Sequence, residues 1–270
     1  MPEVPFPRFP RSFVAGMVPF IVAGLIIFTS YPLTKVPFPH PVIFYLSLFF
    51  SVVAVTGVIG YENLVEELGF DVTQHGEKLE EVWWRYIVFS LFGFVFAYTT
   101  YKIAMSKTLG YSLIPLPIDF AIAHSLLAYP FVVSFVNWIV VALFEEIQRN
   151  AGSFIFANWL AHRFKLSKDA SIVGGVFLGS VMFILLHTVA WSQTASLASY
   201  IFGIFMAMSF SLLGYSLATR LLGPISFFEF SIVPGVVAHF TWDLLVDMNL
   251  RVLPGPMAML ALTWWSTTPP

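Results

Sequence analysis

The sequence predicts an all-α, polytopic integral membrane protein of about eight transmembrane helices that enclose a buried polar site. Three observations lead to this prediction. Of the 270 residues, 58% are hydrophobic and 10% are charged, whereas about 25% are charged in a typical soluble domain. Apolar runs long enough to cross about 30 Å of hydrocarbon recur along the chain. A few ionisable side chains lie within these runs, where each costs about 2.5–3.5 kcal/mol to insert.

The clear apolar runs predict helices, because backbone groups in lipid must find hydrogen-bond partners within their own segment. There are six long runs and a shorter seventh one near the C-terminal end. The runs are Phe13–Tyr31, Val42–Tyr61, Trp83–Tyr101, Ser171–Trp191, Ala195–Leu222, Phe228–Met248 and Val252–Trp265.

The stretch from Ile118 to Phe164 has two interpretations, because Pro130 interrupts it and proline usually kinks or ends a helix. One helix could end at Phe144 and leave the following acids at the membrane interface. The alternative is a partial helix before Pro130 and one long helix over Phe131–Phe164. We favour the long helix, because apolar residues resume directly after the acids.

Residues 1–270 read as a single transmembrane domain, in which residues 1–12 form a proline-rich and extended tail. Most of the 13 Lys and Arg residues fall on the side of the N-terminus, which places that side inside. The expected location is the cell membrane in a prokaryote or the endoplasmic reticulum membrane in a eukaryote. The net charge of −2 and the absence of basic stripes predict no nucleic-acid partner.

The first polar cluster at membrane depth is Glu145, Glu146 and Arg149. The i, i+4 spacing predicts that Glu145 pairs with Arg149, while Glu146 points about 100° away and needs another partner. The cluster could be a structural ion pair. Two carboxylates exceed the charge of one arginine, however, and the surplus carboxylate suits a general base.

Two further clusters lie on later helices. The segment Phe183–His187 ends in a histidine, and His239 precedes Asp243 by one helical turn. Each could be a hydrogen-bonded core group, and we expect Asp247, one turn later, to be exposed. A single shared polar active site explains all three clusters together, and it has the groups needed to activate water.

A metal ion is compatible with these residues but is not required by them. Cysteine is absent, and the sequence contains neither H-E-x-x-H nor G-x-S-x-G, which excludes a classical zincin and a serine elbow. If zinc is present, we expect Glu145, His187 and His239 to bind it. The preferred mechanism needs no cofactor.

The ordered set "EEIQR", "FILLH" and "HFTWD" resembles the CAAX protease and bacteriocin-processing family, which includes the type II CAAX prenyl endopeptidases. The resemblance covers residues 137–248. It implies an intramembrane endopeptidase in which Glu145 and His187 activate water and His239 stabilises the oxyanion. Glu146 and Arg149 would hold the base, and Asp243 would orient His239. Prenylated or membrane peptides would be the substrates.

The chain departs from the family pattern in the position of its arginine, and it has Asp243 where some members of the family have an asparagine that can help to bind the oxyanion. The family spaces its acids and arginine as E-E-x-x-x-R, whereas Arg149 comes one residue early and Asn150 stands at the expected place. This shift leaves open which Glu takes the catalytic role, and it favours one alternative function, an inactive membrane scaffold for assembly. A proton-coupled transporter also stays open, because Glu and His chains can relay protons. The oligomeric state does not follow from the sequence.

Overall fold

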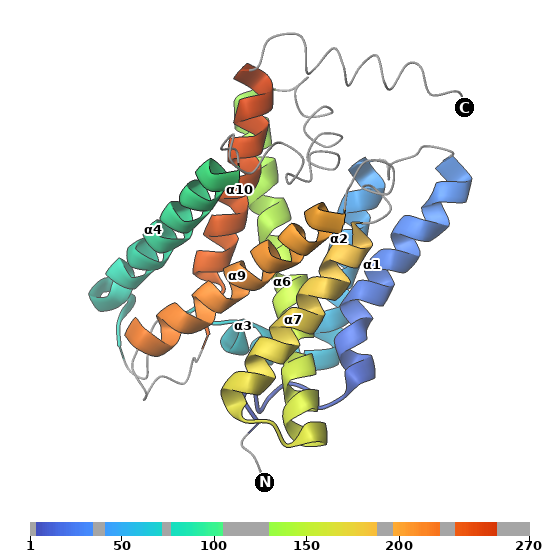
Figure 1. Ribbon diagram of the computed structural model, residues 1–270, viewed down its shortest axis with the longest axis vertical. Helices are drawn as coiled ribbons and strands as arrows, with labels where there is room; N and C mark the ends of the chain where they lie inside the picture. Colours follow the sequence, from blue (N-terminus) through green and yellow to red (C-terminus); the bar gives the residue numbers. More distant parts are fainter. Residues whose placement is uncertain are drawn as a thin grey trace.

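The computed structural model describes residues 4–34, 41–71, 77–104, 130–187, 197–221 and 230–252. These residues form eight helices and no strand, which confirms the all-α prediction (Figure 1). The helices are α1 (Phe13–Thr34), α2 (Pro41–Ile59), α3 (Tyr61–Glu67), α4 (Leu79–Ala104), α6 (Phe131–Phe164), α7 (Lys168–Leu186), α9 (Leu197–Leu221) and α10 (Val233–Val252).

Four of the described helices, α4, α6, α7 and α9, are long and apolar enough to cross a membrane. Helices α2 and α3 together make a fifth span if their pair, bent by 99°, is counted as one. The bend falls at Gly60, whose φ of 89° favours glycine. The described residues thus support four to five spans, and the expected count of about eight is not confirmed. The run Val252–Trp265 lies almost wholly outside them.

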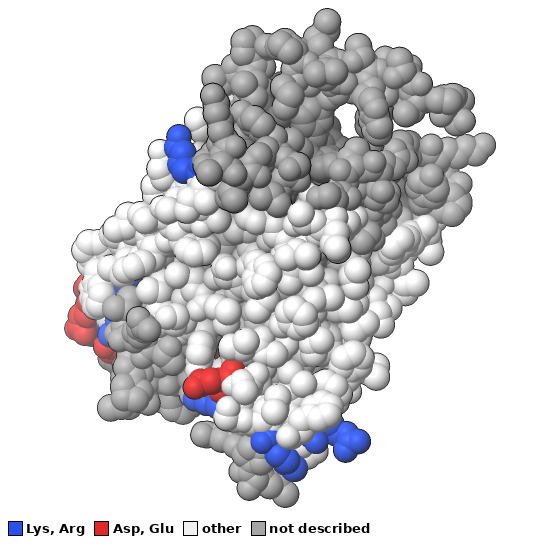
Figure 2. Space-filling view, viewed as in Figure 1, with Lys and Arg blue, Asp and Glu red and all other residues white. Residues whose placement is uncertain are grey.

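The surface carries the apolar side chains that a lipid-facing protein needs. Large hydrophobic residues are exposed on most of the long helices, for example Leu25, Leu91, Val136, Phe177 and Phe205. Figure 2 shows a broad uncharged band, with basic side chains gathered at the end where Figure 1 places the N-terminus. Such a band is compatible with an integral membrane protein.

Helix α6 is the centre of the fold and packs against α1, α2, α7 and α10. It begins after Pro130 and runs without a break to Phe164, so the long-helix interpretation is confirmed. Lys165 then adopts a left-handed conformation with φ of 57° and ends the helix. Ser167 caps α7 by accepting a hydrogen bond from the Ala170 amide.

Helices α6 and α7 approach each other closely because small residues face one another across the contact. A Cβ atom at Gly175 would lie 2.7 Å from the Ala157 Cβ, and one at Gly179 would overlap the Ser153 side chain. This close approach fixes the position of α7 relative to the acids of α6.

The N-terminal segment is folded against the helices, which corrects the expectation of an extended tail. Phe6 and Phe9 are buried, and the Phe9 amide donates to the Phe6 carbonyl in a turn. The Phe6 ring stacks on Phe154 with centroids 3.9 Å apart. Asn158 of α6 accepts from the Phe6 amide and donates to the carbonyls of Phe6 and Phe9. Apolar burial and a buried amide therefore outweigh the extended preference of the prolines.

Candidate active site

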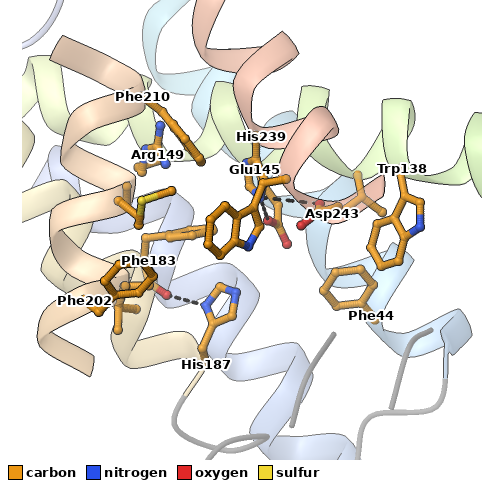
Figure 3. A pocket seen from close by; sticks show the side chains of 16 residues that line it. Phe44, Trp138, Glu145, Arg149, Phe183, His187, Phe202, Phe210, His239 and Asp243 are labelled. Atoms are coloured by element: carbon orange, nitrogen blue, oxygen red, sulfur yellow. Dashed lines mark hydrogen bonds and ion pairs between the residues drawn. The ribbon is translucent and has the colours of Figure 1, made fainter. Parts of the chain in front are cut away.

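Three helices bring the sequence-predicted polar residues to one cavity of about 80 Å³. Helix α6 contributes Glu145 and Arg149, the C-terminal end of α7 contributes His187, and α10 contributes His239 and Asp243 (Figure 3). The cavity has room for a few water molecules. The shared polar site expected from sequence is thus present in the geometry.

Glu146, the sixth of these residues, lies behind the cavity rather than on its wall. Its side chain is fully buried and forms an ion pair with Arg149. It also accepts hydrogen bonds from the Asn150 amide at 3.0 Å and from His239 Nδ1 at 2.9 Å. A Cβ atom at Gly235 would lie 3.1 Å from Glu146 Oε2, so the glycine leaves the space that the carboxylate occupies.

Glu145 is the member of the acidic pair that faces the cavity. Its side chain is buried, and its Oε2 lies 3.3 Å from His239 Nε2. Arg149 makes its short ion pair with Glu146 at i, i+3, whereas the sequence analysis expected Glu145 at i, i+4. Because Glu146 already receives three donors, Glu145 is the carboxylate placed to meet a substrate or a water.

His239 is held between three carboxylates. Its Nδ1 faces Glu146, while its Nε2 lies 3.3 Å from Glu145 and 3.6 Å from Asp243. An ionised carboxylate only accepts hydrogen bonds, so a proton on Nδ1 is shared with Glu146. A proton on Nε2 would lie on the cavity side of the ring, next to the carboxylates of Glu145 and Asp243.

Arg149 balances part of the negative charge of the site. Its guanidinium carbon lies 5.6 Å from the centroid of the Phe183 ring and 5.9 Å from that of Phe210. Both aromatic faces attract a cation and exclude water from it. The arginine is 1% exposed, and it fixes Glu146 from the side of α7 and α9.

His187 occupies the opposite side of the cavity from Glu145 and His239 (Figure 3). Its Nδ1 lies 2.8 Å from the Phe183 carbonyl oxygen, one turn earlier. A carbonyl only accepts hydrogen bonds, so Nδ1 carries the proton and the neutral ring presents Nε2 as an acceptor. This tautomer suits a group that receives a hydrogen bond from water.

The remaining lining of the cavity is apolar and largely aromatic. Its members come from α2, α6, α7, α9 and α10 and include Phe44, Trp138, Phe202, Phe210 and Trp242. Such walls exclude bulk water, which strengthens electrostatic interactions within the site.

Two buried polar residues were not expected from the sequence, Ser211 beside the acidic cluster and Asp247 on α10. Ser211 of α9 is buried and donates to Asn150 Oδ1 at 2.6 Å, but serine is common in apolar helices and gives no distinctive signal. Asp247 is fully buried, which corrects the expectation that it is exposed. A third ionisable residue at one-turn spacing, after His239 and Asp243, was the signal that could have placed it inside.

A metal site does not emerge from the residues proposed for zinc. No group of three or more His, Asp or Glu side chains in the described part of the chain is arranged to hold a metal ion. His239 Nδ1 is committed to Glu146, and its Nε2 faces two carboxylates. We therefore derive no step through a metal. His124 and Glu229, two further polar residues of the apolar segments, lie outside the described residues.

Comparison with known proteins gives no match. No protein-family model matches the chain, and neither the curated proteins nor the solved structures contain a significant match.

Proposed function

We propose that the chain is an intramembrane endopeptidase that hydrolyses prenylated or other membrane-associated peptides, with about eight transmembrane helices in the complete fold. The observation that carries this proposal is the position of Glu145. Its carboxylate lines a small cavity beside His239 and faces His187 across it. A carboxylate, an imidazole acceptor and an imidazole N–H donor around one small cavity are the groups that amide hydrolysis needs.

The proposed reaction begins with a water molecule between Glu145 and His187. Glu145 takes a proton from this water as the water oxygen bonds to the scissile carbonyl carbon. The Nε2–H group of His239 then donates a hydrogen bond to the oxyanion that forms. Glu145 passes its proton to the leaving nitrogen as the C–N bond breaks, which releases a carboxylic acid and an amine.

The other polar residues support these steps without touching the substrate carbonyl. Glu146 holds His239 through Nδ1, and Arg149 offsets the charge of Glu146. Asp243 lies 3.6 Å from His239 Nε2 and keeps the proton on the cavity side. The resemblance to the CAAX protease and bacteriocin-processing family supports the same assignment of roles.

The full chain in lipid nanodiscs, with fluorogenic peptides as reporters, provides the test. One reporter is a farnesylated CAAX-type peptide, and the other is an unprenylated membrane peptide. Glu145→Gln and His187→Ala should each lower the hydrolysis rate by about 10²–10⁴-fold, the usual contribution of general acid–base catalysis. Glu62→Gln is the matched control, because Glu62 is exposed on α3.

The comparison of the two reporters decides whether a prenyl group is required. Full activity in both site variants would overturn the proposed mechanism. A wild-type chain that is folded but cleaves neither reporter would favour the non-catalytic scaffold instead, particularly if the chain purifies in a stable complex with another membrane protein.

A further inference from the structure

Behind the cavity, a buried chain of hydrogen bonds crosses from α9 to Glu146 of α6 and continues to His239 of α10. Ser211 Oγ donates to Asn150 Oδ1 at 2.6 Å, and Asn150 Nδ2 donates to Glu146 Oε2 at 3.0 Å. Glu146 Oε1 in turn faces His239 Nδ1 at 2.9 Å. Ser211, Asn150 and Glu146 are each at most 1% exposed, so water does not compete for these bonds.

The hydroxyl of Ser211 satisfies the oxygen end of the Asn150 amide. The two ends of an asparagine amide differ in function: the nitrogen donates and the oxygen accepts. With the nitrogen directed at the Glu146 carboxylate, the oxygen needs a donor, and Ser211 is that donor. Without the Ser211 hydroxyl, the buried oxygen of Asn150 would have no donor. The free-energy cost of that unsatisfied acceptor would weaken the preference of the Asn150 amide for the orientation that holds Glu146.

We propose that Ser211 and Asn150 are positioning residues that fix the imidazole of His239 through the carboxylate of Glu146. The inference rests on the proposed function, because the purpose of the chain of bonds is to aim His239 Nε2 at the cavity. Neither residue lines the cavity or contacts the place where the substrate carbonyl would lie.

The early position of the arginine gives Asn150 this role. The residue four positions after Glu146 is Asn150, which shares its face of the helix, and Arg149 reaches Glu146 from three positions away. The arginine supplies the opposing charge, while the amide donates to both Glu146 Oε2 and the Glu146 backbone carbonyl. Arg149 and Asn150 both donate to Glu146 Oε2, and Oε1 faces His239 Nδ1, so both carboxylate oxygens are engaged.

The kinetic test uses the full chain in nanodiscs and the cleaved reporter peptide. We expect Ser211→Ala to lower kcat about tenfold, and Asn150→Leu about 10²-fold, with KM unchanged in both. Ser211→Thr keeps the hydroxyl and should restore wild-type kcat. Ser209→Ala is the matched control, because Ser209 lies two residues away on α9 and bonds its own helix at Phe205. The double variant of Ser211 and Asn150 should be no slower than Asn150→Leu alone.

A second readout reports on the imidazole without requiring activity. In protein with ¹⁵N-labelled histidine, the Nδ1–H proton of His239 should give a low-field, slowly exchanging resonance, which His239→Gln assigns by its disappearance. Ser211→Ala and Asn150→Leu should shift or broaden this resonance, while Ser209→Ala leaves it unchanged.

The two readouts separate the inference from the proposed function. A wild-type chain without peptidase activity contradicts the proposed function, and the resonance still decides the positioning role. An unchanged resonance in both Ser211→Ala and Asn150→Leu overturns the inference, as does a kcat loss that Ser211→Thr does not restore.

Discussion

His239 Nδ1 lies 2.9 Å from Glu146 Oε1, although the two residues are 93 positions apart in the chain. This contact joins α10 to α6 at the depth of the site. It also determines which ring nitrogen faces the cavity, because the nitrogen engaged by the buried carboxylate cannot meet a substrate. The proposed catalytic geometry depends on this contact more than on any other.

Glu146→Gln should therefore reduce activity without altering access to the cavity. The glutamine oxygen can still accept from His239, but its NH₂ group meets the donors of Arg149 and Asn150 and leaves the arginine charge uncompensated. We expect kcat to fall about 10²-fold at unchanged KM, and stability to fall by about 3–5 kcal/mol. Kinetics and thermal unfolding in detergent measure the two effects. Wild-type kcat in this variant would show that Glu146 does not orient the imidazole.

Asp243→Asn should retain activity to within about tenfold, whereas Asp243→Leu should lose it. The Asp243 carboxylate faces His239 Nε2 at 3.6 Å. An asparagine amide keeps an acceptor for that nitrogen and adds a donor that can reach an oxyanion. A leucine provides neither. Initial rates on the reporter peptide check this, and equal rates for the two variants would exclude a polar role for the position.

The long helix through the acidic cluster could be predicted from the sequence, because apolar residues continue on both sides of Glu145 and Glu146. The placement of each acid could not. Periodicity gives the angle between two side chains on one helix, but the face that meets the cavity depends on how α6 sits between α7 and α10. The same limit explains Asp247, whose burial comes from its neighbours rather than from its own helix.

The N-terminal segment shows a second limit of sequence reasoning. Proline favours extended backbone, and no local pattern shows that Phe6 and Phe9 will find a partner. The partner is Asn158, which is 152 residues away from Phe6. Long-range contacts of this kind are decided by packing and leave no periodic signal in the chain.

Gly175 lies in the contact between α6 and α7 and Gly57 does not, so replacement by alanine should affect stability very differently at the two positions. A Cβ at Gly175 would lie 2.5 Å from the Ala157 amide nitrogen, so α7 would have to move. We expect Gly175→Ala to destabilise the protein by about 1–3 kcal/mol and to lower activity, because α7 carries His187 at its end. At Gly57 a Cβ meets nothing within 4 Å, so Gly57→Ala should be neutral or stabilising by up to about 1 kcal/mol. Thermal unfolding in detergent compares the stabilities of the two variants. Equal losses of stability would contradict the close approach of α6 and α7.

Asn158→Leu should release the N-terminal segment while the helices stay folded. The substitution removes three hydrogen bonds to the backbone of Phe6 and Phe9, and each is worth about 0.5–1.5 kcal/mol. Trypsin should then cut after Arg8 and Arg11 much faster than in the wild type, as mass spectrometry of the truncated chain would show.

Asn63→Ala is the matched control for this experiment. The Asn63 side chain donates to the Ile59 carbonyl one turn earlier, so its hydrogen bond stays local. The control should therefore be cut at the wild-type rate. Cleavage of the Asn158 variant at that same rate would mean that the stacking of Phe6 on Phe154 holds the segment without the amide.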